Sequence, residues 1–415
     1  MKSKVLFLSI APPENHCGVR VVMYRHLVER EPFEVLVATN ADYALEPQPH
    51  LALQLPYLLQ RLRKTRFGPY LNRWIIDFEN LIWPLLPNPA VDKAIRDFQP
   101  DILLVLADNC LAEIARRAAK RYHLPLVGLF LDWFPIMKGY YGHSWSSAWL
   151  SRRFEQFYAA CNLALCTSDG MQEVLGTHPN SHVIYPMPGQ HKIPERSESS
   201  SESSANKKFR LVYVGSVENF YGRMLCSLIQ QFESLPDQEI IVVGPNADWD
   251  SELLDSAIAQ GTYLGFKPPT EAAKILAGAD ALLVVMSFEE TYELFMRTSF
   301  TTKFLDYASF GKPIILWGPD YCTPVKVVNK FGGALLVTQP NAEDIVSVCQ
   351  QLAAEPELQS KMAKQAKHLH QTLFNPDRLQ SIFVEEIEKL VNRSTTKLAA
   401  SDRPLPAMKA EEVKT

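Results

Sequence analysis

The sequence lacks the features of membrane-spanning and nucleic-acid-binding proteins. No uninterrupted apolar run reaches the roughly 18 to 20 residues that cross a bilayer, and the run at residues 5–10 leads into two prolines rather than a cleavage site. Lys and Arg (42) are slightly outnumbered by Asp and Glu (46), whereas proteins that bind phosphate backbones usually carry a basic excess. We therefore expect a cytoplasmic protein with no nucleic-acid partner, whose membrane contact, if it has one, is weak and peripheral at the inner face.

Cysteine motifs and a dinucleotide-binding motif are also absent. The seven cysteines are odd in number and scattered, and none forms a Cys-x-x-Cys pair or stands with a histidine cluster. This pattern indicates reduced thiols in a reducing compartment and no metal site. No Gly-x-Gly-x-x-Gly follows an apolar run, which argues against a nicotinamide-dependent dehydrogenase.

What the sequence does contain is a repeated pattern of short apolar segments between helical ones. At 415 residues, with 47% hydrophobic and 21% charged residues, the chain is globular in composition and too long for one core. Short buried strands that alternate with helices predict parallel βαβ units. We expect strands at residues 5–10, 33–40, 101–108, 124–133 and 162–167, and again at 209–216, 239–244, 262–265, 281–286 and 313–318.

A segment rich in Ser and Glu separates the two halves. Residues 193–208 contain too few apolar side chains to order themselves, which predicts a linker. We therefore predict an α/β protein with two Rossmann-like, doubly wound domains: residues 1–192, with a helical insertion at about 50–90, and residues 209–391. Residues 392–415 are expected to be a mobile tail.

The expected insertion combines basic and aromatic residues. Between residues 55 and 87, cations alternate with aromatic and aliphatic side chains, the cations being Arg61, Arg63, Lys64, Arg66 and Arg73. Such a mixture suits an anionic bilayer surface or a lipid-linked acceptor. A helical subdomain with a solvated basic face is the alternative, and the sequence leaves both open.

The stretch most specific for chemistry is residues 299–316. Its spacing predicts a helix whose first turn presents three hydroxyls, those of Ser299, Thr301 and Thr302. Hydroxyls and free N–H groups at a helix amino terminus bind anions, and Lys303 adds a positive charge. Asp306, one turn further on, can accept two hydrogen bonds from a ribose diol. An ordinary amphipathic helix with a Ser/Thr cap remains the alternative.

This stretch resembles the GT-B glycosyltransferases related to the family 4 retaining enzymes, and the resemblance extends over most of residues 1–391. In that family the helix carries two Glu separated by seven residues, in a pattern close to Glu-x-Phe-Gly followed by Leu-Glu-Ala and ending in Gly-x-Pro. This sequence is similar at four positions, Phe300, Leu305, Gly311 and Pro313. The resemblance implies two Rossmann-like domains that face a central cleft.

The two family carboxylates have different counterparts here. Asp306 occupies the position of the second, which holds the nucleotide ribose, so the resemblance implies the same role. Thr298 stands at the position of the first, which faces the donor sugar. Glu289, Glu290 or Glu293 would have to replace it through a loop shift. We expect this departure to alter donor choice rather than to abolish activity.

The resemblance also assigns residues to the diphosphate. Residues 211–223 are similar to the family's strand and loop beside that group, where Gly215 and Ser216 permit close backbone approach. Arg223 is the best cation of this segment, with a surface arginine as the alternative. A weaker likeness, in the loop after the first strand, places Gly18 near the diphosphate or the acceptor.

A further segment, residues 263–285, resembles the one that forms the family's base pocket. Gly265 and Phe266 are therefore expected against the nucleobase, with a core role for Phe266 as the alternative. Asp132 ends an apolar run and His143 follows it, where the acceptor side of the family's cleft collects polar groups. Structural roles for both are the alternative.

Together these resemblances imply transfer of a glycosyl group from a nucleoside diphosphate sugar to a hydroxyl of a carbohydrate or lipid-linked acceptor, with retention, in glycan or glycolipid synthesis. We expect Asp132, Arg223 and Lys303 to be catalytic, and the family generally needs neither a metal nor a cofactor. Two alternatives remain open: an isomerase similar to the nucleotide-sugar 2-epimerases, and a GT-B module that binds a sugar nucleotide without catalysis.

Overall fold

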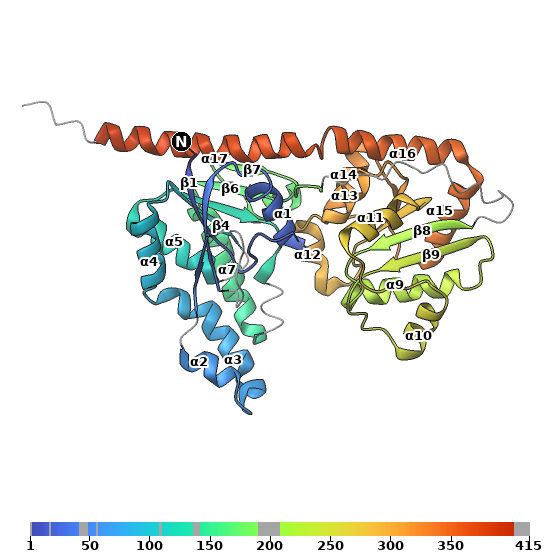
Figure 1. The fold of residues 1–415 in the computed structure, drawn as a ribbon, viewed down its shortest axis with the longest axis horizontal. Helices are drawn as coiled ribbons and strands as arrows, with labels where there is room; N and C mark the ends of the chain where they lie inside the picture. Colours follow the sequence, from blue (N-terminus) through green and yellow to red (C-terminus); the bar gives the residue numbers. More distant parts are fainter. Residues whose placement is uncertain are drawn as a thin grey trace, which may run out of the picture.

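The computed structural model describes residues 2–15, 18–40, 49–54, 57–107, 110–135, 142–189 and 208–401, so the expected linker lies outside the described residues except for Lys208. Two lobes stand side by side, each with a central sheet covered by helices (Figure 1). In the described part of the chain, no helix is both long enough and apolar enough to cross a membrane.

The first domain is built on a seven-stranded parallel sheet in the order β3-β2-β1-β4-β5-β6-β7. Its strands are β1 (Lys4–Leu8), β2 (Glu34–Thr39), β3 (His50–Ala52), β4 (Ile102–Leu106), β5 (Leu126–Phe130), β6 (Leu163–Cys166) and β7 (Ser181–Val183). Alternate residues of β1 enter two different cores: Val5 and Phe7 pack on one face, and Leu6 and Leu8 on the other. Burial on both faces explains why these strands are continuous apolar runs.

The helical insertion expected at about 50–90 is helical over most of residues 57–85, whereas its first residues, His50–Ala52, form the edge strand β3. The described helices of the first domain are α1 (Gly18–Leu27), α2 (Tyr57–Arg63), α3 (Gly68–Leu81), the 3-10 helix η1 (Trp83–Leu85), α4 (Pro89–Phe98), α5 (Cys110–Tyr122), α7 (Ser144–Ala160) and α8 (Asp169–Leu175). Helices α2 and α3 lie at the lower end of this lobe, on the opposite side from α17 (Figure 1).

The second domain has a five-stranded parallel sheet in the order β12-β11-β10-β8-β9. Its strands are β8 (Phe209–Val214), β9 (Gln238–Val243), β10 (Ala281–Val285), β11 (Ile314–Trp317) and β12 (Leu335–Val337). The strand expected at 262–265 is wrong, because only an isolated bridge joins Tyr263 to Val242. Gly261 and Gly265 have positive φ on either side of this bridge and turn the chain away from the sheet.

The helices of the second domain surround that sheet and end in a long helix that returns to the first domain. They are α9 (Asn219–Phe232), α10 (Ser251–Ala259), α11 (Pro269–Ala277), η2 (Glu290–Tyr292), α12 (Glu293–Thr298), α13 (Thr302–Ala308), α14 (Thr323–Phe331), α15 (Ala342–Ala354), α16 (Pro356–Gln371) and α17 (Pro376–Ser401). Figure 1 shows α16 along the second lobe and α17 along the first.

Helix α17 joins the two domains through a buried contact. His26 Nδ1 of α1 lies 2.8 Å from Gln380 Oε1, and the His26 ring packs 4.4 Å from that of Phe383. Burial lowers the pKa of His26 to about 4, so the ring is neutral at pH 7. The boundary expected at 391/392 falls inside α17, which continues to Ser401, and the buried apolar residues of this helix, Leu379, Phe383 and Ile387, all precede it. Residues 402–415 of the expected tail lie outside the described residues.

Candidate active site

Residues that follow strands of the first sheet meet helices α12 and α13 of the second domain. Ser168, which follows β6, donates a hydrogen bond to the Thr298 carbonyl at 2.5 Å. At Gly170 a Cβ would lie 1.9 Å from the Arg297 carbonyl oxygen, so only glycine permits this approach. Because ligands of doubly wound sheets bind beyond the carboxyl ends of the strands, this contact region is the candidate site.

Lys303 is the cation of this region. Its Nζ lies 4.5 Å from the ring centroid of Tyr221 and 5.5 Å from that of Tyr213, and no described residue accepts a hydrogen bond from it. Burial lowers the pKa of Lys303 to about 8, while the Asp306 carboxylate acts in the opposite direction. An ammonium group held against two aromatic faces, without a hydrogen-bonded carboxylate, is suited to receive an anionic ligand.

The end of β8 is shaped to admit this lysine. A Cβ at Gly215 would lie 1.9 Å from Lys303 Cε, so the lysine stem occupies the space that a larger residue would fill. Tyr307, on the same helix as Lys303, fixes α13 against β8: its hydroxyl accepts a hydrogen bond from Val214 N–H (2.8 Å) and donates one to the Val214 carbonyl (3.0 Å). Gly215 and Lys303, both predicted site residues, are therefore in contact.

Asp132 follows β5 and lies near Ser299 and Tyr221. Burial raises its pKa, and its charge in turn contributes to the raised pKa of Tyr221, so both groups share the surroundings of Lys303. The Ser299 hydroxyl lies close enough to lower the Asp132 pKa, yet its Oγ is buried and makes no hydrogen bond of normal geometry to a described residue. Buried hydroxyls are usually paired, so this Oγ is available to a ligand or water.

The anion site predicted at a helix amino terminus is wrong in its details. Ser299 caps the carboxyl end of α12, and α13 starts only at Thr302, with Thr301 before it making no side-chain cap. Two short helices thus replace the single helix expected from the spacing. With only seven residues in α13, the helix dipole adds little, and Lys303 is the charge that remains.

The Asp306 carboxylate is hydrogen-bonded to residues of the first domain and is not available to a ligand alone. Its Oδ1 accepts hydrogen bonds from Arg25 Nη1 (3.1 Å) and from Gly189 N–H (2.7 Å), both of the first domain. A ribose diol would compete with these donors. The ribose role of Asp306 stays a prediction.

Arg223 is paired instead of facing Lys303. Its Nε and Nη2 donate to Glu289 Oε1 at 2.9 and 2.6 Å, at an exposed position on α9. This agrees with the alternative of a surface arginine, since exposed ion pairs contribute little energy and reorganise readily. Its role at the diphosphate stays a prediction.

The predicted base-side residues lie beyond β9, beside the end of β8. Gly244 packs so closely that a Cβ would lie 2.0 Å from the Gly215 carbonyl oxygen, and its N–H donates to the Gly265 carbonyl at 3.1 Å. Phe266, which follows, is 59% exposed, which excludes the alternative of a core residue. The Ser216 carbonyl accepts a hydrogen bond from the Tyr213 hydroxyl at 2.6 Å.

For the two remaining predicted residues, His143 and Gly18, the described part of the chain shows no contact with Lys303. His143 packs against the insertion: its Nδ1 is 2.5 Å from Asp77 Oδ2, and its ring centroid is 4.4 Å from that of Trp74. Gly18, at the exposed start of α1, has a φ of 57°, and a Cβ at this position would meet no atom within 4 Å, so the glycine borders open space.

Sequence reasoning missed Tyr221 and Arg25. Tyr221 lies within the segment 211–223, but its contact with Lys303 depends on how α9 lies beside α13. Arg25 reaches Asp306 across the domain boundary, a contact that no local pattern encodes. An Asp-x-Asp pair is also present, at Asp248 and Asp250, and both carboxylates accept backbone N–H groups, of Asn219 (2.8 Å) and Glu252 (2.9 Å).

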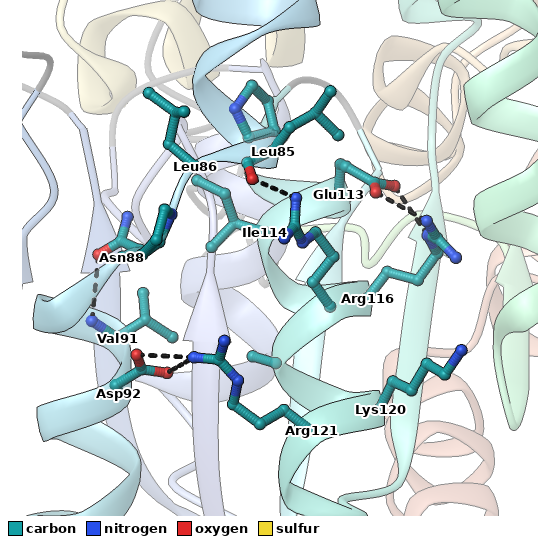
Figure 2. Close-up of a pocket in the computed structure, with 14 residues that line it drawn as sticks. Leu85, Leu86, Asn88, Val91, Asp92, Glu113, Ile114, Arg116, Lys120 and Arg121 are labelled. Carbon is teal, nitrogen blue, oxygen red and sulfur yellow. Dashed lines mark hydrogen bonds and ion pairs between the residues drawn. The ribbon is translucent and has the colours of Figure 1, made fainter.

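A separate pocket of about 590 Å³ lies on the first domain between η1, α4 and α5. Figure 2 shows that its charges are largely paired internally: Arg116 with Glu113, and Arg121 with Asp92. Lys120 extends from α5 without a drawn partner. Because the pocket lies within the first domain and two of its three arginines are paired with carboxylates, we do not assign it to the nucleotide.

Comparisons with known proteins identify the fold. No family model and no curated protein matches the chain. Among solved structures, HepE from Anabaena, in complex with UDP and glucose, has a TM-score of 0.64 at 14% identity, covering 93% of this chain and 100% of that one. Sucrose-phosphate synthase from Thermosynechococcus elongatus has 0.65 at 12%, covering 97% and 100%. A protein assigned as a UDP-N-acetylglucosamine 2-epimerase from Listeria monocytogenes has 0.53 at 14%, covering 98% and 99%. The predicted fold class is confirmed: this chain has the GT-B fold, with two Rossmann-like domains.

Proposed function

We propose that this protein is a glycosyltransferase that moves a sugar from a nucleoside diphosphate sugar to a hydroxyl acceptor, in glycan or glycolipid synthesis. The observation that carries the proposal is Lys303, a cation without a hydrogen-bond acceptor among the described residues, held beside the backbone of Gly215 where the two domains meet. The fold adds support, because HepE, a structural neighbour, was solved with UDP and glucose.

In the proposed reaction the acceptor oxygen forms a bond to the anomeric carbon while the bond from that carbon to the diphosphate breaks. The electron pair leaves with the diphosphate, and Lys303 stabilises the negative charge that grows there. Asp132, with its raised pKa, takes the proton of the acceptor hydroxyl. Retention of configuration and independence from metals belong to the same proposal and rest on the family resemblance.

The carboxylate that faces the donor sugar in the family has no direct counterpart here. A threonine hydroxyl is not a carboxylate, and the buried hydroxyl of Thr298 donates to the Leu294 carbonyl at 2.8 Å. Thr298 therefore does not replace the family carboxylate. Glu289 is paired with Arg223, and Glu293 with Arg297 at 2.7 Å. Glu290 is exposed in η2 and would still require the loop shift. We therefore propose Asp132, whose pKa is raised by burial, as the carboxylate for chemistry in this region.

Two other functions are compatible with the fold. An isomerase is favoured by the neighbour from Listeria monocytogenes, and a non-catalytic sugar-nucleotide module by Thr298. The three functions differ in whether the donor is converted and whether an acceptor is needed for nucleoside diphosphate to be released. A transferase releases nucleoside diphosphate only when an acceptor is present, whereas an epimerase converts the donor without an acceptor, and a binding module does neither.

The test starts with a thermal-shift panel of nucleoside diphosphate sugars, in which a ligand at about 100 times its dissociation constant adds roughly 2.7 kcal/mol of stability. Release of nucleotide from the best donor is then measured with and without a mixture of sugar and lipid-linked acceptors. We expect acceptor-dependent release, lost in Asp132→Asn while the thermal shift is kept. Equal release without an acceptor, epimerised donor, or a shift without any turnover would each reject the proposal.

A further inference from the structure

Five aromatic side chains are exposed on two neighbouring helices of the first domain. Phe67, Tyr70 and Trp74 follow one another at spacings of three and four along α3, and Trp145 and Trp149 lie one turn apart on α7. Tyr70 is 83% exposed, Trp149 61% and Trp74 59%. These five residues are called the aromatic face below. Gathered large apolar side chains at the surface mark an interaction site, whereas single ones do not.

The two rows of the aromatic face are held together. The ring of His143 lies 4.4 Å from that of Trp74 and 6.2 Å from that of Trp145, so it bridges α3 and α7. Arg153 Nη1 of α7 also donates to the Asn80 carbonyl of α3 at 2.9 Å. The two helices that carry the aromatic face are therefore held together, with Trp74 and Trp145 on either side of His143.

The charge around the aromatic face has one sign. Residues 57–76 contain five basic side chains and no Asp or Glu, although the whole chain has a formal charge of −4. Lys64, Arg66 and Arg73 are exposed, and the guanidinium of Arg66 lies 4.8 Å above the ring of Phe67. Cations and aromatic rings thus share one surface.

Of the five basic side chains of residues 57–76, one pairs with an acidic side chain that follows on α3. Asp77 is buried and binds His143, and Glu79 accepts a hydrogen bond from Arg63 at 2.8 Å. On α7, Arg152 lies one turn beyond Trp149, and Glu155 lies one further turn on, about 120° around the helix from Trp149.

We propose that the aromatic face and the cations beside it dock onto an anionic lipid surface. Tryptophan and tyrosine rings settle at the headgroup level, where an apolar body and a polar edge are both satisfied. Lys and Arg beside them attract anionic lipids, so the two contributions act together. This combination matches a bilayer better than an apolar protein groove, which would leave the cations unpaired. The proposal does not depend on the proposed function.

The test is co-sedimentation of the full chain with vesicles of phosphatidylcholine alone or mixed with phosphatidylglycerol, at 0.1 and 1 M salt. We expect binding only to the mixed vesicles and only at low salt, because the Debye length falls from about 10 to about 3 Å. In a triple variant, Lys64→Gln, Arg66→Gln and Arg73→Gln, the partition coefficient should fall on the order of a hundredfold, since each cation contributes about fivefold. Tyr70→Ser with Trp149→Ser should weaken binding at unchanged charge.

The matched control changes three exposed lysines of α16 in the second domain, Lys361→Gln, Lys364→Gln and Lys367→Gln. It removes the same charge and should bind as the wild type does. Circular dichroism and melting temperature should be unchanged in all variants, because the substituted side chains are exposed. Equal loss in the control, binding unaffected by both variants of the first domain, or sedimentation as a dimer through Trp149 without vesicle binding would overturn the proposal.

Discussion

At the scale of single residues, the site depends on the surroundings of Lys303. The Lys303 stem passes over Gly215 and its ammonium rests against Tyr221, in surroundings that lower its pKa to about 8. Desolvation disfavours the charged form, and a bound diphosphate would restore it. Charge on this lysine and occupancy of the site are therefore linked.

This linkage predicts how UDP affinity varies with pH. Lys303 is mostly protonated at pH 7 and mostly neutral at pH 9, because its pKa in the free protein is about 8. The attraction to diphosphate is thus present below pH 8 and lost as pH rises through it, so the dissociation constant of UDP should rise about tenfold from pH 7 to pH 9. Isothermal titration calorimetry at the two pH values measures this.

Lys303→Gln is the matched variant, since glutamine keeps most of the length of the stem but has no titrating charge. It should bind UDP more weakly at pH 7 and show no rise toward pH 9. A wild-type affinity that does not change with pH, or an equal rise in the variant, would mean that another group governs UDP binding.

Sequence patterns located some of these residues and not others. Gly215, directly after a strand, and Lys303, in the stretch 299–316, were predicted from local patterns, and the structure brings the two into contact. Their roles stay predictions. Tyr221 and Arg25 could not be predicted, since their roles arise from packing between elements that are distant in the chain. Ser299 was predicted in the first turn of the helix, but it lies at the C-cap of α12, and α13 begins only at Thr302.

At the scale of elements, the contact between β8 and α13 positions the site. Both hydrogen bonds of the Tyr307 hydroxyl go to Val214, the last residue of β8, and Gly215 follows directly. The strand end and the helix therefore form one unit, in which backbone and Lys303 leave no room for a side chain at position 215.

Gly215→Ala should therefore impair ligand binding more than folding. The added methyl would lie 1.9 Å from Lys303 Cε, and the flexible lysine can move aside at small cost to stability. Displacing it removes a charged hydrogen-bond donor, so UDP should bind about 10- to 100-fold more weakly. Calorimetry with UDP, alongside thermal unfolding, separates the two effects.

Gly278→Ala serves as the comparison, because a Cβ there meets only ordinary contacts at 3.5 Å, at the end of α11. This variant should bind UDP as the wild type does. Equal affinities for Gly215→Ala and the wild type would show that the lysine does not contact the ligand.

At the scale of the whole molecule, two sheets could be predicted and their junction could not. Buried strands such as β4 and β10 are unbroken apolar runs, which the sequence displays directly. The junction instead relies on scattered contacts: Ser168 with Thr298, Arg25 with Asp306, and α17 against His26. Each needs both domains in place, so no local pattern predicts them.

The central claim is that a nucleoside diphosphate binds where the two domains meet, with its charge on Lys303. A crystal structure of the full chain with UDP tests this most directly. We expect a diphosphate oxygen at hydrogen-bond distance from Lys303 Nζ, about 2.7 to 2.9 Å, beside the backbone of Gly215. UDP bound instead in the pocket between α4 and α5 (Figure 2), or with its diphosphate turned away from Lys303, would contradict it.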